Sequence, residues 1–196
     1  MCIRDRNTIN EKLGTDYRLF NYYGAPDADR VIVAMGSVCD TIQETVDFLN
    51  ARGEKVGMVK VHLYRPFSAK HLLAALPETV KHISVLDRTK EPGSLGEPLF
   101  LDVVAALKGS AFNDVPVYGG RFGLGSKDTV PAHIIAVYNN MAAPQPKPEF
   151  TLSIEDDVTH LSLPVTENPD TTPAGTTSCK CRQPGAGSGW GWWSYR

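Results

Sequence analysis

The sequence predicts an α/β fold, with an open, mainly parallel sheet covered by helices on both faces. Two observations carry this prediction. Short β-branched apolar runs alternate with amphipathic helical stretches through the middle of the chain. The run Arg30–Met35 is continuously apolar after its first residue, as in a parallel strand buried on both faces. The 196 residues, 42% hydrophobic and 21% charged, suffice for one sizeable globular domain.

The first strand and helix are set by residues 30–53. Strand Arg30–Met35 is closed by Gly36, and Ser37 is predicted to cap the next helix by accepting a backbone N–H. The helix begins at Val38, and its apolar residues recur at three- and four-residue steps. It is expected to end at Gly53, a residue suited to the C′ position.

A second strand–helix unit and a third strand follow. Val56–Tyr64 alternates apolar and polar side chains, which predicts a half-buried strand. Pro66 stops this strand, and Ser68 is predicted to cap a helix over Ala69–Leu76. His82–Asp87 is predicted to be the third strand.

The remaining elements repeat the pattern. An apolar stripe over Leu99–Leu107 predicts a helix, and Val115–Tyr118 predicts the fourth strand. Asp128 or Thr129 is expected to cap the final helix, with Pro131 near its first turn. Repeated strand–helix–strand units favour right-handed crossovers into one parallel sheet.

The two ends of the chain differ from its middle. Residues 1–6 resemble a translated sequencing adapter, and we set them apart from the α/β domain expected over 7–143. A linker and the truncated start of a next domain are expected over 144–180. Residues 181–196 hold all three tryptophans among glycines without periodicity, which is typical of a frameshifted tail. A genuine start codon and a natural flexible tail are the alternatives.

Composition excludes several classes of partner. The net charge of −2 provides no bulk basic field for nucleic acid or an anionic membrane. No apolar run approaches the length of a membrane span, and no signal peptide opens the chain. Four cysteines do not make a disulfide scaffold. We therefore expect a cytoplasmic protein without nucleic-acid or membrane partners.

The reactive side chains form no recognisable catalytic, cofactor-binding or metal site. Cys39 lies in the first turn of a helix, where it is either a reactive thiol or, as we favour, a small buried hydrophobe. The cysteines lack zinc or iron–sulfur spacing, and the histidines show no HExxH pattern. We assign no residue to catalysis, to a cofactor or to a metal.

The sharpest site hypothesis concerns the carboxyl ends of the strands, where ligands bind in open parallel sheets. Ser37, Arg65, Arg88 and Arg121 are predicted to lie there. Converging arginines would make an anion or partner-docking site. The alternative, which we favour, is that Arg65 and Arg88 pair with local carboxylates or carbonyls at a domain interface.

Several of these stretches are similar to known families. VIVAMGS and VKVHLYRPFS resemble the C-terminal domain of the transketolase superfamily, in which a strand ending in Gly-Ser precedes a helix. More closely, the chain from Tyr17 to about Lys180 resembles the pyruvate:ferredoxin (flavodoxin) oxidoreductases. The matching pieces are Phe20–Ala28, Val31–Val38, Val61–Phe67, Leu86–Gly93, Tyr118–Asp128 and Asn168–Lys180.

This resemblance implies a piece of a large multidomain enzyme that converts pyruvate and coenzyme A to acetyl-coenzyme A and carbon dioxide. The family uses thiamine diphosphate, magnesium and [4Fe–4S] clusters, and passes electrons to ferredoxin or flavodoxin. The chain would be the second domain with a stub of the third, binding none of these groups itself. It would be inactive alone and would pack against the thiamine-binding domains and a dimer partner.

The match departs from the family after Lys180, where the family's glycine-rich string is lacking unless the tail is translated one base over. Two alternatives remain. One is a free-standing anion- or nucleotide-binding α/β module that uses the strand-end arginines. The other is the C-terminal part of a transketolase-like or 2-oxoacid dehydrogenase subunit, against which the continuing segment NPDTTPAGTTSCK argues. As a piece of a larger enzyme, the chain should expose apolar patches and be poorly soluble alone.

Overall fold

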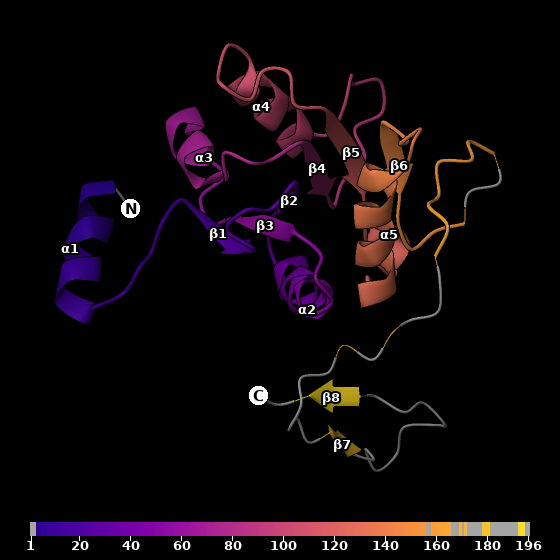
Figure 1. Cartoon of the computed structure of the whole chain (residues 1–196), viewed down its shortest axis with the longest axis horizontal. Helices are drawn as coiled ribbons and strands as arrows, with labels where there is room; N and C mark the ends of the chain where they lie inside the picture. Colours follow the sequence, from indigo (N-terminus) through magenta and orange to yellow (C-terminus); the bar gives the residue numbers. More distant parts are fainter. Residues whose placement is uncertain are drawn as a thin grey trace.

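The computed structural model describes residues 3–155, 158–165, 169, 171, 178–180 and 192–194. Its centre is a six-stranded open sheet with the order β1-β3-β2-β4-β5-β6 (Figure 1). The strands are β1 Phe20–Gly24, β2 Arg30–Ala34, β3 Val56–Val61, β4 His82–Asp87, β5 Val117–Arg121 and β6 Glu149–Thr151. Neighbouring strands are parallel except for β1, which runs antiparallel to β3. The mainly parallel open sheet is confirmed, whereas the edge strand β1 was not predicted.

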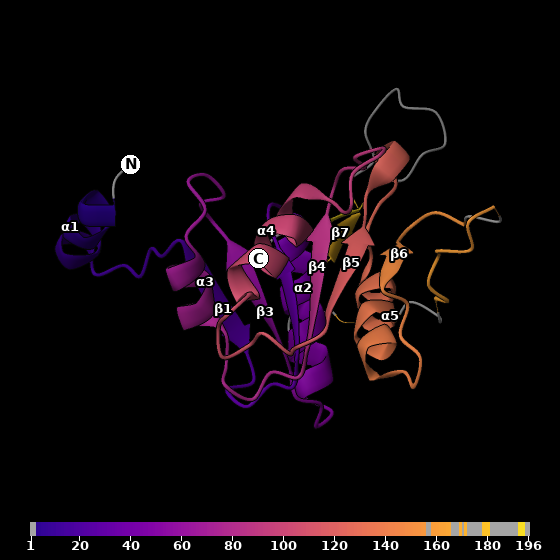
Figure 2. The ribbon, with the colours of Figure 1, turned by 90° about the horizontal axis from the view of Figure 1, so that it is seen from above.

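Helices cover both faces of the sheet, as predicted. They are α1 Ile3–Leu13, α2 Val38–Asn50, α3 Ala69–Ala75, α4 Pro98–Leu107 and α5 Pro131–Ala142. In Figure 1, α3 and α4 lie above the sheet and α2 lies below it, while both views place α1 to one side of the sheet (Figure 2). Alternate residues of β2 enter two cores, Ile32 facing α2 and α5 and Val33 facing α3 and α4.

Strand β3 differs from the half-buried strand that its polar residues predicted. It ends at Val61, and every residue except Lys60 is buried. The reason is its central position, because β3 lies between β1 and β2 and is covered on both faces. Met58 and Val59 therefore enter opposite cores.

Strand β5 begins and ends later than predicted and includes glycines that the sequence placed in a loop. Gly119, Gly120 and Arg121 pair with β6 and extend the strand. Gly120 faces the core, where an added Cβ would lie 2.4 Å from the Phe150 ring. These glycines therefore admit the core side chains of neighbouring strands.

The predicted helix caps are wrong. Ser37 already has helical angles (φ −64°, ψ −25°) and makes no capping bond with its side chain. The turn is made by Gly36 at φ +81°, whose carbonyl accepts from the Cys39 N–H at 3.1 Å. Ser68 occupies the predicted position before α3, but its hydroxyl meets His71 Nδ1 at 2.7 Å and makes no capping bond.

The final helix is capped by a histidine. Val130, rather than Asp128 or Thr129, precedes the helix, and Pro131 is its first residue. The Val130 N–H donates to His133 Nδ1 at 3.1 Å, as the side chain at the third helical position does in a capping box.

Acidification below pH 6.5 is expected to weaken α5. Burial lowers the pKa of His133 below its ordinary 6.5, so the unfolded chain binds more protons just below that pH. Protonation also removes the Nδ1 lone pair that accepts from Val130, a bond worth about 1 kcal/mol. The His133→Gln variant, whose amide oxygen accepts without titrating, should lose less stability between pH 7.5 and 5.5 in urea unfolding. Equal losses in the two proteins would contradict this assignment.

The sheet and core continue beyond residue 143. β6 pairs with β5, and Phe150, Leu152 and Leu163 are buried in the core beneath α2 and α5. Lys147 Nζ donates to the carbonyls of His160 and Ser162 at 2.7 and 2.8 Å, which ties the following segment to β6. The domain boundaries expected near 143 and 180 stay predictions.

The two ends are described only in part. Residues 3–6 of the expected adapter segment lie in α1. Most of the expected frameshifted tail lies outside the described residues, apart from β8 Trp192–Ser194, which pairs antiparallel with β7 Ser178–Lys180. In the part of the chain that the structure describes, no helix combines the length and apolar character needed to cross a bilayer.

Candidate functional site

The winding of the sheet locates the candidate site. From β2 the chain moves outward to β3, then crosses back past β2 to β4 and continues outward to β5. The strand order therefore reverses between β2 and β4, and ligands of open α/β sheets bind at the carboxyl side of such a point. Here that side carries the loop 35–37 after β2 and the loop 88–97 after β4.

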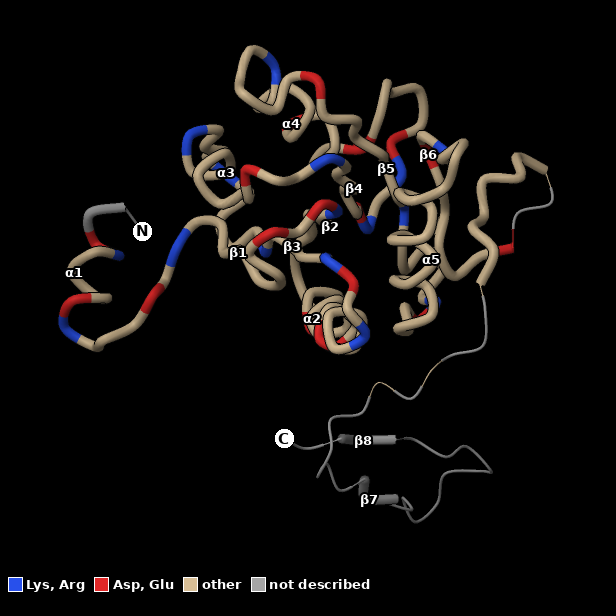
Figure 3. Tube along the Cα trace, in the orientation of Figure 1, with Lys and Arg blue, Asp and Glu red and all other residues tan. Residues whose placement is uncertain are grey.

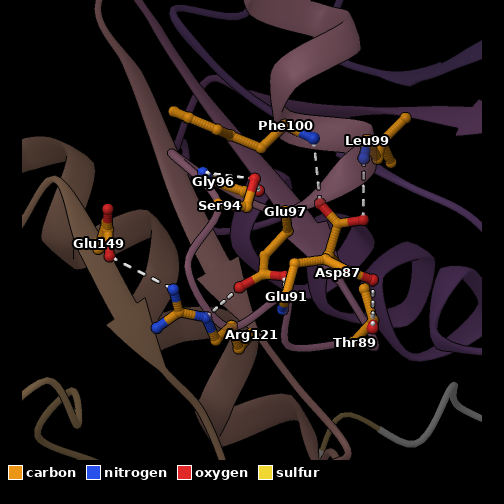
Figure 4. Close-up of polar contacts among 10 residues, drawn as sticks. All are labelled: Asp87, Thr89, Glu91, Ser94, Gly96, Glu97, Leu99, Phe100, Arg121 and Glu149. Atoms are coloured by element: carbon orange, nitrogen blue, oxygen red, sulfur yellow. Dashed lines mark hydrogen bonds and ion pairs between the residues drawn. The ribbon is translucent and has the colours of Figure 1, made fainter.

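Asp87, the last residue of β4, anchors the start of α4. Its side-chain oxygens accept from the Leu99 and Phe100 N–H groups, both at 3.1 Å (Figure 4). A carboxylate at a helix N-terminus satisfies amides that lack partners within the helix. Burial raises the pKa of Asp87 above its ordinary value, and the nearby charge of Glu97 acts in the same direction.

Arg121, the last residue of β5, lies between two glutamates (Figure 4). Its Nε donates to Glu97, which is only 4% exposed, and its Nη2 lies 3.4 Å from Glu149 on β6. The other carboxylate oxygen of Glu97 accepts from the Glu91 N–H at 2.8 Å. The Glu97 carboxylate is the main cause of the raised pKa of Arg121. Arg121 thus joins the loop 88–97, β5 and β6, and its charge is neutralised internally.

Arg65 is also paired, at the surface. Its Nη1 lies 2.7 Å from Asp102 of α4, and its guanidinium lies 3.9 Å from the centre of the Tyr64 ring. The Asp102 carboxylate raises the pKa of Arg65. Burial, with Asp102, raises the pKa of Tyr64 to about 12, so the phenol keeps its proton at neutral pH.

Arg88 and Ser37 are placed differently. Both are exposed, and within the described ranges Arg88 has neither an ion pair nor a hydrogen bond. The Arg88 side chain lies against Gly123, where an added Cβ would come 2.9 Å from Nε.

The four predicted site residues therefore lie at or just after strand ends on one edge of the sheet but have separate surroundings. Arg65 pairs with a local carboxylate, as the favoured alternative expected, and Arg88 does not. Their role as an anion or docking site stays a prediction. Sequence reasoning missed the acidic partners of the arginines, for which the available signal was weak. Glu97 precedes a helix proline, and nothing in the local sequence links Asp102 to Arg65 or Glu149 to Arg121.

Cys39 is a buried hydrophobe rather than a reactive thiol, as favoured. It is 6% exposed, and its Sγ lies 3.5 Å from the Ala34 carbonyl. Burial raises the pKa of the thiol to about 11 despite its place at a helix start.

Alkylation of Cys39 is expected to be slow in the folded chain and fast in urea, because the thiolate is both disfavoured and covered. Iodoacetamide labelling, followed by mass spectrometry of the peptide that contains Cys39, measures both rates. Equal rates in the two conditions would contradict the buried assignment.

Metal donors are not assembled in the described part of the chain. No group of three or more His, Cys, Asp or Glu among those residues could hold a metal ion. Cys39 is the one cysteine whose side chain is described, and it is buried. The cysteine set of an iron–sulfur cluster is therefore not found in that part of the chain.

Residues 28–134 match the family of pyruvate:ferredoxin oxidoreductase core domain II. The chain belongs to this family. The matched residues of core domain II run from the segment before β2 into α5 and include Ser37, Arg65, Arg88 and Arg121. The family resemblance found in the sequence is thereby confirmed.

The curated relatives that this chain matches are much longer than the chain. The chain is 59% identical over 173 residues to a pyruvate-flavodoxin oxidoreductase of Enterobacter agglomerans, covering 88% of this chain and 15% of the relative. It is 58% identical over 167 residues to a pyruvate:ferredoxin oxidoreductase of Moorella thermoacetica, covering 85% and 14%. It is 53% identical over 171 residues to a mitochondrial pyruvate dehydrogenase [NADP(+)] of Euglena gracilis, covering 85% and 9%. The chain thus spans between 9% and 15% of these relatives.

Proposed function

We propose that the chain serves as core domain II of an enzyme that oxidises pyruvate with coenzyme A to acetyl-coenzyme A and carbon dioxide, delivering electrons to ferredoxin or flavodoxin. The family match over residues 28–134 supports this proposal. Thiamine diphosphate, magnesium, the [4Fe–4S] clusters and coenzyme A belong to the rest of the parent polypeptide in this proposal. The parent enzyme would be cytoplasmic and dimeric.

The electron acceptor is chosen outside core domain II in this proposal. The three relatives are named for flavodoxin, ferredoxin and NADP(+), yet each is 53% to 59% identical to this chain. Such uniform similarity is expected of a domain that does not meet the acceptor.

The domain acts as a scaffold, and the single observation that carries this role is the Glu97–Arg121–Glu149 cluster, in which two carboxylates occupy the donors of one guanidinium. In an anion site the guanidinium would face a cleft with its donors free. Here Arg121 forms ion pairs with two carboxylates. These pairs link the loop 88–97, β5 and β6 at the carboxyl edge of the sheet. Such a network fixes the edge against which neighbouring domains would pack.

A chimaeric enzyme tests the proposal. Residues 17–165 of this chain would replace the aligned segment of the Enterobacter agglomerans enzyme, and pyruvate- and coenzyme A-dependent reduction of flavodoxin would be measured anaerobically. We expect activity close to that of the parent, whereas the 196-residue chain alone should show none. A chimaera that assembles with its cofactors but does not turn over would overturn the proposal.

Calorimetry of the isolated chain tests the competing module hypothesis. Titration with thiamine diphosphate, coenzyme A and ATP should give no heat of binding. Micromolar binding that the Arg88→Gln variant abolishes would favour the free-standing anion-binding module instead.

A further inference from the structure

Helix α4 carries apolar residues on its outer side as well as on its buried side. Leu99, Val103 and Leu107 are buried against the sheet. The opposite side carries Leu101 and Val104, which are 37% and 39% exposed. Asp102 is the one charged residue of the helix, and Figure 3 accordingly shows few charged positions along it. Apolar residues on the outer side of a helix are normally covered by a further element or partner.

The loop before α4 enlarges this surface. Leu95 is 92% exposed, the highest value among the exposed large hydrophobic residues that the structure describes. It adjoins Gly96, where an added Cβ would lie 3.4 Å from a methyl carbon of Leu101. Leu101 thus approaches the backbone next to Leu95, and Val104 follows Leu101 three residues later on α4; these three exposed apolar residues are called here the α4 patch.

The α4 patch has a mostly basic border. Its loop carries exposed Arg88, Lys90 and Glu91, and exposed Lys108 directly follows α4. Asp102 of α4 forms an ion pair with Arg65. An apolar centre with a polar rim is the composition of an interface between domains or proteins. The excess of cations favours a covering surface with carboxylates at its edge.

We propose that the α4 patch docks onto another domain of the parent polypeptide, through an apolar surface rimmed by acidic residues. This inference rests on the proposed function. The length of the relatives supports another domain as the partner of the patch, because at least 85% of their length lies outside the segment that this chain matches. The loop 88–97, which carries Leu95, is fixed to the domain on both sides of Leu95, because Glu97 accepts from the Glu91 N–H and pairs with Arg121, while Asp87 accepts from the Leu99 N–H at the start of α4.

Thiol labelling compares the patch in the isolated chain and in the chimaera described above. Leu101→Cys is introduced into both, and the alkylation rate at position 101 is measured by peptide mass spectrometry. We expect the rate in the chimaera to be lower by about tenfold or more, because reactivity follows access. Cys39, which is 6% exposed, is the buried control, and its alkylation should be slow in both the isolated chain and the chimaera.

The outcomes separate this inference from the proposed function. An active chimaera with unchanged labelling at position 101 overturns the docking surface and leaves the proposed function standing. An assembled but inactive chimaera that protects position 101 supports the surface and overturns the function. Protection in the isolated chain, with sedimentation as a dimer, would make a second copy the occupant and overturn the inference.

A second variant keeps the test decisive when the chimaera does not assemble. In the isolated chain, the double variant Leu101→Glu, Val104→Glu should bind markedly less hydrophobic dye with an unchanged urea midpoint, because both side chains are exposed. Leu13→Glu, at a residue that is 68% exposed on α1, is the matched control and should change dye binding less. Equal dye binding by the double variant and the unaltered chain would overturn the inference.

Discussion

Replacing Arg121 with methionine is expected to destabilise the folded chain by about 3 to 5 kcal/mol. Methionine keeps much of the aliphatic volume but leaves Glu97, 4% exposed, as a buried carboxylate without its cation. The loop 88–97 and β6 would both lose a partner, since Arg121 contacts Glu97 and Glu149. Urea unfolding followed by circular dichroism measures the change as a lower midpoint at an unchanged slope.

Two variants control this expectation. Adding Glu97→Gln to Arg121→Met removes the unpaired charge and should restore part of the lost stability, as a double-mutant cycle would record. Arg65→Met breaks the exposed pair with Asp102, in which the Arg65 side chain is 57% exposed, and should cost about 1 kcal/mol or less. Equal losses for Arg65→Met and Arg121→Met would contradict the assignment of Arg121 as a buried structural cation.

Replacing Gly120 with alanine is expected to cost about 1 to 3 kcal/mol through overpacking. The added methyl carbon would lie 2.4 Å from Phe150 and 2.6 Å from Leu86, both fully buried. Neither side chain has free space to enter, so β5 and β6 must move apart. The measurement is again the urea midpoint, supported by the near-ultraviolet dichroism of the aromatic residues.

Gly119→Ala is the matched control on the same strand. Its added carbon would lie 3.3 Å from the ring of Phe100, which is only partly buried and can shift toward solvent. A smaller loss than for Gly120→Ala is therefore expected. The reverse order would show that the close approach of Phe150 to Gly120 does not limit the packing of this sheet.

The sequence predicted the secondary-structure elements better than it predicted the contacts of the candidate site residues. The apolar run after Arg30, the helical stripe from Val38 and the strand His82–Asp87 were each predicted close to their observed bounds. These elements depend on local periodicity, which fits one type of secondary structure. Family membership was equally accessible, since motifs such as LDRTKEPG are carried by contiguous residues.

The sequence pattern was less informative wherever a property depends on neighbours that are distant along the chain. Lys60 and His62 suggested a half-exposed strand, but β3 is central because β1 adds to its outer edge. Gly120 suggested a loop, but it admits Phe150 from a strand that begins 29 residues later, at Glu149.

Local periodicity therefore determined which segments are strands and helices, and contiguous motifs determined the family. The pairing of the arginines required the fold, because ion pairs depend on which side chains the folded chain brings together. Arg121 meets Glu97 across 24 residues, Arg65 meets Asp102 on a different helix, and Arg88 meets no carboxylate in the described chain. Three arginines at or just after the carboxyl ends of strands thus have three different environments.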